Sequence, residues 1–391
     1  MEEKLQTIDL SKNEKESLPE LAPGTIICDN YEIVKEIDRG GMDSVVYLVK
    51  HVKDKQLYAA KIIYKTKKTT ETQWKAFKDE IITCTRIFKC PNVVHTHAIE
   101  MQPDSNRIIN VMDYVNGPSL REVIAQYNHL SVEEAIYIFK KIIIALNSLH
   151  SFKHKIIHLD LKPENVMLSS DRSEVKIIDF GISNVLISDQ GKSKSLTKKD
   201  NMFGTCAYLN PDIIKTKIFI EKDQPQDTME ILSKVMNEQM DFYAFGIMFF
   251  ETLTGRKPFY AKDYKDDKVM TLPLKYDVPI MSNENPKIPV VLDNIVYRCM
   301  ASKSEDVENR YHSAVEILQD LSLAERQIDT PTATQLIKPA NKRTFQPVDK
   351  FNFKLEKNKA RFYNTKWFFI LLCFVVVCVD IAVIAVAAAS R

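Results

Sequence analysis

The stretch HLDLKPENVM, residues 158–167, decides how this chain folds and what chemistry it can carry out. It gathers polar and charged side chains that are costly to bury, namely His158, Asp160, Lys162, Glu164 and Asn165. Apolar runs lie on both sides of it, ALNSLH before and VKIIDFGIS after. We therefore read it as a loop between a helix and a strand, and the strand that follows ends in Asp-Phe-Gly.

Length and composition set the outer limits. The chain has 391 residues, enough for two or three domains of roughly 150 residues each. The net charge of +2 does not indicate a nucleic-acid partner. Seven cysteines occur without any CxxC pair, so we expect free thiols in a reducing cytosol and no zinc site.

The segment from Trp367 to Ala389 differs from the rest because its only charged residue is Asp380. At ~1.5 Å per residue a helix of this length spans roughly 34 Å, enough for a hydrocarbon core of ~30 Å. Basic residues precede it: Lys354, Lys357, Lys359, Arg361 and Lys366. We expect a single-pass anchor in the cell membrane with the preceding chain in the cytoplasm. The basic stretch is either a topology signal or a site for anionic lipid headgroups.

The first part of the chain shows strand patterns. YEIVKEI (31–37), SVVYLVKH (44–51), QLYAAKIIYK (56–65) and RIINVMDYVNG (107–117) alternate or are rich in β-branched residues. Between 70 and 88 apolar positions recur at helical spacing. This pattern predicts a small sheet with one inserted helix.

After Gly117 helical patterns dominate. Ser131 precedes Glu134 by three residues, which indicates a capping box at the start of a helix. DFYAFGIMFFETLTG (241–255) is almost wholly apolar, yet too short to cross a bilayer, and reads as a buried helix. A last helix is expected from His312 to Ala324, followed by a linker.

These motifs together resemble a eukaryotic-like (Hanks-type) serine/threonine protein kinase over Tyr31 to Leu323. The resemblance implies an α+β, bilobal protein-kinase fold, with a small β-rich N-lobe and a large helical C-lobe. We expect the divisions 1–30 (flexible), 31–115 (N-lobe), 116–324 (C-lobe), 325–366 (basic juxtamembrane linker) and 367–389 (transmembrane helix).

The resemblance assigns roles in phosphoryl transfer from ATP, which needs positioning and charge neutralisation more than covalent help. Asp160 would orient the acceptor hydroxyl or accept its proton, and Lys162 would lie near the γ-phosphate. Asn165 and Asp179 would bind Mg²⁺ (or Mn²⁺), a hard cation that prefers such oxygen ligands. Any one of these residues could instead be part of a hydrogen-bonded loop; the joint pattern favours catalysis.

The nucleotide would be held mainly from the first lobe. Lys61 in YAAK resembles the family's ATP-binding lysine, with Glu80 as its expected ion-pair partner. Met112 would be the gatekeeper, and the backbones of Asp113 and Val115 would bind adenine. Other expected nucleotide contacts are Ile37, Gly40, Gly41 and Val45.

The glycine-rich turn, IDRGGMDSVV, departs from the family pattern. Asp38 and Asp43 stand where the first and third glycines are expected. Aspartate tolerates left-handed backbone better than most residues, but two carboxylates near a triphosphate are unfavourable unless they point away.

The segment FGTCAYLNPD resembles the end of an activation segment. Asp212 stands where a glutamate is usual, and we expect a buried, slightly looser ion pair with Arg310. Asp241 should bind the backbone of the catalytic loop. Thr205 and Lys162 fit the serine/threonine subclass. The spacing from Asp212 to Asp241 implies an insertion around 217–236 of unassigned role.

Leu159 occupies the position where many family members carry an arginine that pairs with a phosphorylated activation segment. We therefore expect activity to depend little on phosphorylation of the residues Ser188, Ser193, Ser195 and Thr197.

Two functions remain open. The first is an active kinase that phosphorylates proteins at the cytoplasmic membrane face; the second is a membrane-anchored pseudokinase scaffold. Retention of Lys61, Asp160, Asn165 and Asp179 favours the first, whereas Asp38 and Asp43 favour the second. A kinase acting on small molecules is disfavoured by GTCAYLNPD, which resembles a peptide-docking segment. The architecture resembles a bacterial family member, and a homodimer is left open.

Overall fold

The computed structural model describes residues 18–40, 43–67, 69–87, 90–101, 106–153, 155–179, 206–216, 231, 235–259, 272–301, 304–328 and 336. The chain divides into two compact units, and all described residues belong to the first, Met1–Pro347. The expected transmembrane helix, 367–389, lies outside the described residues. Among those described, no helix combines the length and apolar character needed to span a bilayer.

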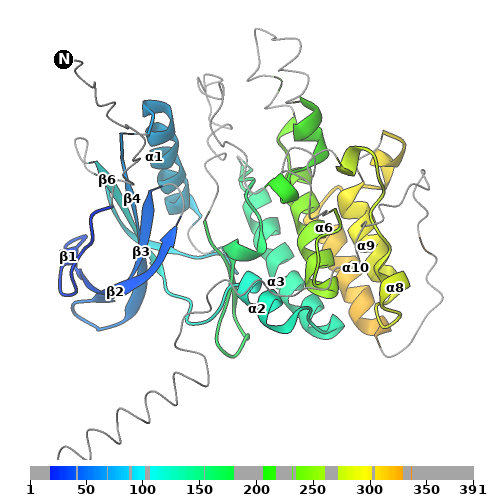
Figure 1. The fold of residues 1–391 in the computed structure, drawn as a ribbon, viewed down its shortest axis with the longest axis horizontal. Helices are drawn as coiled ribbons and strands as arrows, with labels where there is room; N and C mark the ends of the chain where they lie inside the picture. The colour runs from blue at the N-terminus through cyan, green and yellow to red at the C-terminus, as the bar shows by residue number, and fades with distance from the viewer. Residues whose placement is uncertain are drawn as a thin grey trace, which may run out of the picture. The chain divides into compact units, whose positions relative to one another are not determined.

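The first part of the fold is a six-stranded antiparallel sheet in the order β1-β2-β3-β4-β6-β5 (Figure 1). Its strands are β1 (Ile26–Ile27), β2 (Tyr31–Gly40), β3 (Ser44–His51), β4 (Leu57–Tyr64), β5 (Thr96–Glu100) and β6 (Arg107–Asp113). The four predicted strands correspond to β2, β3, β4 and β6. The sheet begins earlier than predicted, because β1 pairs with β2 within the segment expected to precede the lobe.

The inserted helix is α1 (Glu71–Arg86), which packs on one face of this sheet. Trp74, Phe77 and Ile81 of α1 form a buried cluster with Ile63 of β4 and Ile108 of β6. The predicted apolar stripe therefore faces the sheet, and the helix holds one side of β4, the strand that carries Lys61.

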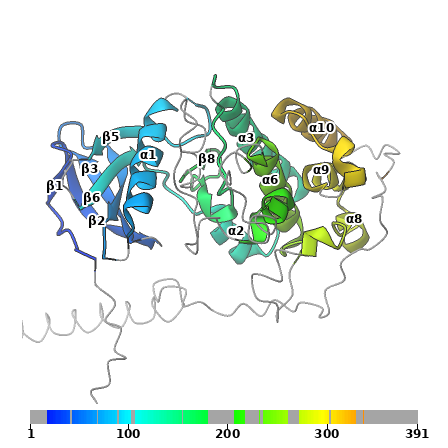
Figure 2. The ribbon, with the colours of Figure 1, turned by 90° about the horizontal axis from the view of Figure 1, so that it is seen from above.

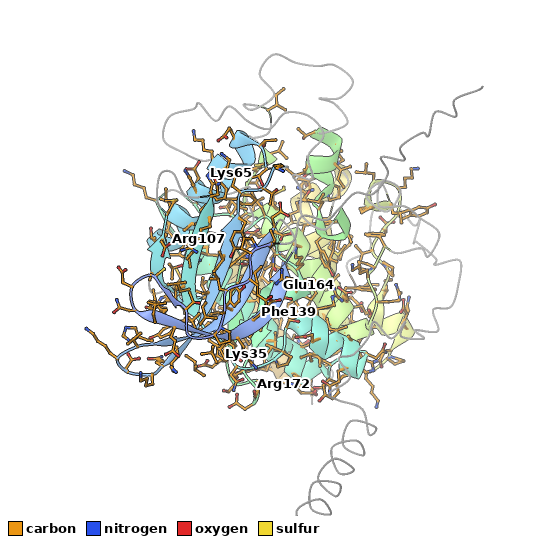
Figure 3. All side chains as sticks on the ribbon, turned by 60° about the vertical axis from the view of Figure 1, so that its left-hand side comes forward. Lys35, Lys65, Arg107, Phe139, Glu164 and Arg172 are labelled. Atoms are coloured by element: carbon orange, nitrogen blue, oxygen red, sulfur yellow. The ribbon has the colours of Figure 1, made fainter. Side chains whose placement is uncertain are left out.

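The second part is mostly helical (Figures 1 and 2). Its helices are α2 (Leu120–Tyr127), α3 (Val132–His150), α6 (Gln239–Thr254), α8 (Met281–Glu284), α9 (Val290–Met300) and α10 (Ala314–Gln327). The core lies between α3 and α6, where the rings of Phe139 (labelled in Figure 3) and Phe249 have centroids 4.6 Å apart. The apolar run of 241–255 is confirmed as a buried helix, and the last helix ends three residues later than predicted.

The start of α3 illustrates how a tertiary contact alters a local motif. The Ser131 side chain accepts a hydrogen bond from the Glu134 backbone N–H (3.2 Å), as predicted. The carboxylate of Glu134 is instead paired with Arg172. A fully reciprocal capping box occurs at α2, between Ser119 and Glu122.

A short hairpin, β7 (Val166–Leu168) and β8 (Val175–Ile177), follows the loop that carries Asp160, Lys162 and Asn165. The chain before α2 packs tightly on it, since the Leu168 N–H donates to Pro118 O (2.9 Å). A Cβ atom on Gly117 would meet Leu168 O at 2.1 Å, so only glycine fits there. This contact fixes α2 next to the hairpin.

Candidate active site

The three residues predicted to be catalytic form one cluster in the loop between α3 and β7. The Lys162 Nζ atom lies 2.7 Å from Asp160 Oδ2. The Asn165 side-chain amide donates to the Asp160 carbonyl O (2.8 Å) and to Asp160 Oδ2 (3.1 Å). Asn165 sits at the end of a short 3₁₀ turn, η1 (Pro163–Asn165), and is buried. These contacts hold the Asp160 carboxylate in a fixed orientation.

The β7–β8 hairpin brings Asp179 to this cluster. Val166 pairs with Ile177, so the residue before β7 and those after β8 lie at the same end of the hairpin. The Ile178 N–H donates to Asn165 O (2.9 Å). Asp179 follows with a left-handed φ of +53°.

Lys61 of β4 reaches Asp179 from the sheet. Its Nζ atom lies 2.7 Å from Asp179 Oδ1. Burial alone would raise the pKa of Asp179, but the Lys61 ammonium opposes this and the pKa is held below its usual value. The carboxylate is therefore ionised at neutral pH, the form that binds a cation. Lys61, Asp160, Asn165 and Asp179 thus meet in one place from three separate segments.

Asp241 supports the catalytic loop from below, as the sequence predicts. Its fully buried carboxylate accepts hydrogen bonds from the backbone N–H groups of His158 (2.9 Å) and Leu159 (3.0 Å). His150 Nε2 lies 2.8 Å from the same carboxylate. Burial would raise the pKa of Asp241, yet the hydrogen bond from His150 contributes to keeping it below the usual value. The two backbone bonds stabilise Leu159 at its strained φ of +62°, immediately before Asp160.

The side chain of Leu159 packs in an apolar cluster. Its neighbours there include Ile157, Ile213, Met236 and Met240. These described surroundings offer apolar contacts at the position where an arginine would face a phosphate. The four predicted phosphorylation positions and Thr205 lie outside the described residues.

The glycine-rich turn shows how an aspartate replaces a glycine. Asp43 has a φ of +53°, the left-handed conformation for which glycine is usual. Its carboxylate accepts a hydrogen bond from Thr66 Oγ1 (2.7 Å), so the side chain is bound to the segment that follows β4. Asp38 is exposed on β2. Of the expected nucleotide contacts, Val45 is buried and Ile37 half-buried.

The remaining nucleotide-binding predictions are described in part. Gly40 ends β2 opposite Ser44, whereas Gly41 lies outside the described residues. Glu80 lies in α1, but its side chain is outside what the structure describes. Its predicted pair with Lys61 stays a prediction.

At the end of β6, Asp113 donates its N–H to His95 O (2.9 Å). Its carbonyl is therefore the backbone atom that it can offer to adenine. Val115 accepts at its own carbonyl from Gly117 N–H (3.1 Å), which leaves its N–H as the complementary group. Met112 is buried beside Ala59 of β4, as a residue behind an adenine ring would be.

The predicted pair of Asp212 and Arg310 is confirmed. Arg310 Nη1 lies 2.7 Å from Asp212 Oδ2. Arg310 also donates through Nε to Ala301 O (2.5 Å), which holds the guanidinium in place. The pair is made through one Arg310 nitrogen, and within the described part of the chain the buried Nη2 atom has no hydrogen-bond partner. The expectation of a slightly looser pair stays a prediction. Most of the predicted insertion, 217–236, lies outside the described residues.

The donor set fits a magnesium or manganese ion bound together with a nucleotide. Among the described residues no group of three or more His, Cys, Asp or Glu side chains could hold a metal. The Asp179 carboxylate and the Asn165 amide oxygen suit an ion that takes its other ligands from phosphates and water. The amide nitrogen of Asn165 is bonded to Asp160, so its oxygen is directed away from that residue.

One residue that contacts the catalytic loop was not predicted from the sequence. Arg121 of α2 lies 2.7 Å from Glu164 of η1 through its Nε atom. No local pattern relates the two, although the Ser-x-x-Glu spacing at Ser119 could have located the start of α2.

Comparisons with known proteins show the family of the chain. A family model described as a protein kinase domain matches residues 31–338. A Mycoplasma genitalium protein is 34% identical over 365 residues, which cover 88% of this chain and 91% of the relative. A Mycoplasma pneumoniae protein is 33% identical over 386 residues, covering 93% and 95%. Both are provisionally named as serine/threonine-protein kinases. PrkC of Bacillus subtilis, named as a serine/threonine-protein kinase, is 27% identical and covers 77% of this chain and 41% of its own length.

The chain therefore belongs to the protein kinase domain family. Within that family it is a serine/threonine protein kinase, similar to those of bacteria. This family uses ATP and a divalent metal ion.

Proposed function

We propose that this kinase is catalytically active, and that it transfers the γ-phosphoryl group of ATP to serine and threonine hydroxyls of proteins at the cytoplasmic face of a membrane. The observation that carries the proposal is the meeting of two pairs of residues. Lys61 lies 2.7 Å from Asp179, and Asn165 donates to Asp160 at 2.8 and 3.1 Å. The backbone bond from Ile178 N–H to Asn165 O (2.9 Å) brings the two pairs together. A carboxylate for the acceptor, a metal-binding pair and a phosphate-binding cation then surround one phosphoryl group.

Each residue has a role that follows from its contacts. Asp160 orients the acceptor hydroxyl and takes its proton, while Lys162 and Asn165 fix its carboxylate. Asn165 and Asp179 would hold the divalent ion, which would supply positive charge to neutralise the phosphates of ATP. Lys61 lies beside Asp179, and from there it would contact the phosphates of bound ATP. Positioning and electrostatics supply most of the catalysis.

The alternative, a pseudokinase scaffold, depends on the two aspartates of the glycine-rich turn. Asp43 weakens that argument, because its backbone adopts the conformation expected of glycine and its carboxylate is bound by Thr66. Asp38 is exposed and free to point into solvent. A scaffold would also have no need for an Asp160 carboxylate held by two side-chain donors.

The membrane location rests on the sequence. The apolar segment 367–389 is long enough to span a bilayer, and the basic residues before it keep the kinase part on the cytoplasmic side. The full chain should sediment with membranes and resist extraction at high salt. A chain ending at residue 366 should be released; its retention at high salt would contradict the anchor.

The activity is tested by incubating the full chain with γ-labelled ATP, magnesium and a generic basic protein, alongside Asp160→Asn. Label transfer to serine or threonine that is lost in Asp160→Asn supports the active kinase. Binding of ATP without transfer in the wild type supports the scaffold.

A further inference from the structure

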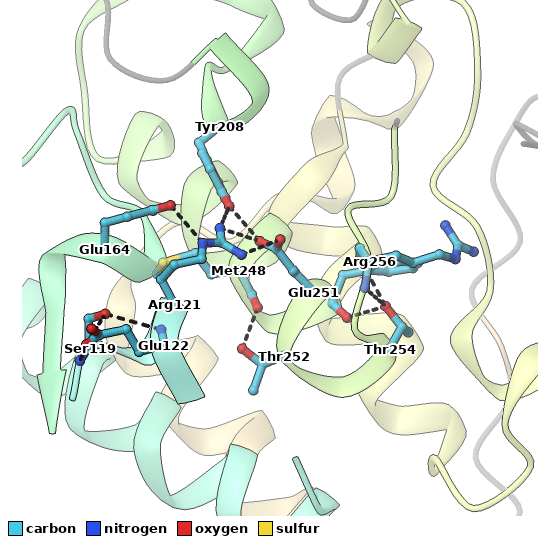
Figure 4. Close-up of polar contacts among 11 residues, drawn as sticks. Ser119, Arg121, Glu122, Glu164, Tyr208, Met248, Glu251, Thr252, Thr254 and Arg256 are labelled. Atoms are coloured by element: carbon cyan, nitrogen blue, oxygen red, sulfur yellow. Dashed lines mark hydrogen bonds and ion pairs between the residues drawn. The ribbon is translucent and has the colours of Figure 1, made fainter. Parts of the chain in front are cut away.

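Arg121 of α2 joins three segments of the chain through one guanidinium group (Figure 4). Its Nε atom lies 2.7 Å from Glu164 Oε1 in η1, and its Nη1 atom 2.8 Å from Glu251 Oε1 in α6. Its Nη2 atom donates to the Tyr208 hydroxyl (2.5 Å) in η3 (Cys206–Tyr208). We call Arg121, Glu164, Tyr208 and Glu251 the Arg121 cluster.

The cluster is built around a buried carboxylate. The Glu251 side chain is only 5% exposed, and Tyr208 is buried above it. The Tyr208 hydroxyl donates to Glu251 Oε2 (2.5 Å). Burial and the nearby Glu251 charge raise the pKa of Tyr208, so this hydroxyl stays protonated as a donor. A planar guanidinium with several N–H donors is the side chain best suited to bind two carboxylates and a hydroxyl at once.

The N-terminal end of α2, the helix that carries Arg121, is held by backbone contacts. Ser119, the N-cap of α2, forms a β-bridge with Met167 of β7. The Ser170 N–H donates to Asn116 O (2.8 Å), just before α2. The start of α2 is thereby attached to the hairpin that positions Asn165 and Asp179.

The two segments that Arg121 holds lie next to the reactants of the proposed reaction. Glu164 directly precedes Asn165, whose amide binds Asp160. Tyr208 belongs to the stretch GTCAYLNPD, which resembles a peptide-docking segment. Movement of either segment would displace Asp160 relative to the acceptor hydroxyl, and misplacement by about 1 Å can cost roughly 100-fold in rate.

We propose that Arg121 is a positioning residue for phosphoryl transfer, which holds the Glu164 turn of the catalytic loop and the Tyr208 segment in a fixed relation through Glu251. This inference rests on the proposed function. All the charges involved belong to the chain itself, so the arrangement requires no phosphorylation.

The test must avoid leaving a buried charge unpaired, because Arg121→Met alone would leave Glu251 without its cation and could unfold the protein. The full chain should therefore carry Arg121→Met together with Glu251→Gln. Arg172→Met together with Glu134→Gln is the matched control, since it removes an ion pair whose arginine is equally exposed (27%).

We expect the Arg121/Glu251 variant to have the same circular dichroism spectrum as the wild type. Its kcat should fall roughly 10- to 100-fold, and its KM for ATP should change less than about twofold. The Arg172/Glu134 variant should stay within about twofold of wild type. An unchanged kcat in the folded Arg121/Glu251 variant would overturn the proposal.

Backbone amide exchange separates this inference from the proposed function. Peptides covering 162–166 and 206–210 should exchange roughly tenfold faster in the Arg121/Glu251 variant, and those covering β3 and β4 at the wild-type rate. If the wild type transferred no phosphate, the proposed function would fail while exchange still decided the role of Arg121. Unchanged exchange in both windows would overturn the inference by itself.

Discussion

Replacing Asp241 with alanine should remove the support of the catalytic loop. The Asp241 carboxylate is fully buried and receives hydrogen bonds from His158 N–H, Leu159 N–H and His150 Nε2. A buried donor left without a partner costs about 1–3 kcal/mol, and partial relaxation prevents the three costs from adding fully. We expect the free energy of unfolding of the C-lobe to fall by about 3–5 kcal/mol.

The assay is urea unfolding measured by far-UV circular dichroism. The urea midpoint is converted into a free energy of unfolding with the m-value of the wild type. Asp171→Ala is the matched control. Asp171 also accepts several hydrogen bonds, from Ser169 and Ser173, but it is exposed, so water can replace its oxygens. Its loss should cost less than about 1 kcal/mol.

The rate of phosphoryl transfer shows whether the catalytic loop still holds Asp160 in place. Without Asp241, Leu159 can leave its φ of +62° and Asp160 moves with it. At a urea concentration and temperature where Asp241→Ala is still folded, kcat should fall at least about tenfold. If Asp241→Ala were as stable as Asp171→Ala, or folded and fully active, Asp241 would not be the support of the catalytic loop.

Three further perturbations concern the activation segment, the buried His158 and the contact of Gly117 with Leu168. The activation-segment residues to be replaced with alanine are Ser188, Ser193, Ser195 and Thr197. These replacements should leave most peptide phosphorylation intact, because Leu159 packs among apolar side chains. Near-total loss of phosphorylation would contradict this. Burial holds the pKa of His158 below its ordinary value of 6.5, so the folded state resists protonation of this residue. The free energy of unfolding should therefore be highest above pH 6.5 and fall as the pH is lowered through 6 to 5. A urea midpoint that does not change over that range would argue against this. Gly117→Ala should lower the free energy of unfolding in urea by about 1–3 kcal/mol, because the new Cβ would meet the backbone of Leu168. Gly24→Ala is the control: its Cβ meets no atom within 4 Å, so it reports only the strain of a positive φ.

The sequence predicted the parts of the fold that depend on local pattern. The catalytic loop was recognisable because Asp160, Lys162 and Asn165 lie within a few residues of one another and bond to one another in the structure. The apolar run of α6 and the Ser131 cap were readable for the same reason. The strands β1 and β5 were missed, since β1 has only two residues and β5 (THAIE) has little apolar alternation.

Contacts between distant segments could not be read from spacing. The family resemblance placed Lys61 and Asp179 in one site, but their direct contact was not predicted, since the two residues come from segments far apart in the sequence. Arg121 and Glu251 are 130 residues apart and follow no pattern that relates them. The Asp43 side chain shows the same limit: aspartate's tolerance of left-handed backbone was predictable, but its bond to Thr66 was not.

We expect Lys61, Asp160, Asn165 and Asp179 to act on one metal-bound triphosphate. Mn²⁺ titrated into ATP-loaded protein, followed by water-proton relaxation, tests this for wild type, Asp179→Asn and Asp160→Asn. We expect Asp179→Asn to weaken Mn²⁺ binding roughly 10- to 100-fold, whereas Asp160→Asn should bind Mn²⁺ within about threefold of wild type yet transfer no phosphate. Equal Mn²⁺ binding by Asp179→Asn and the wild type would contradict it.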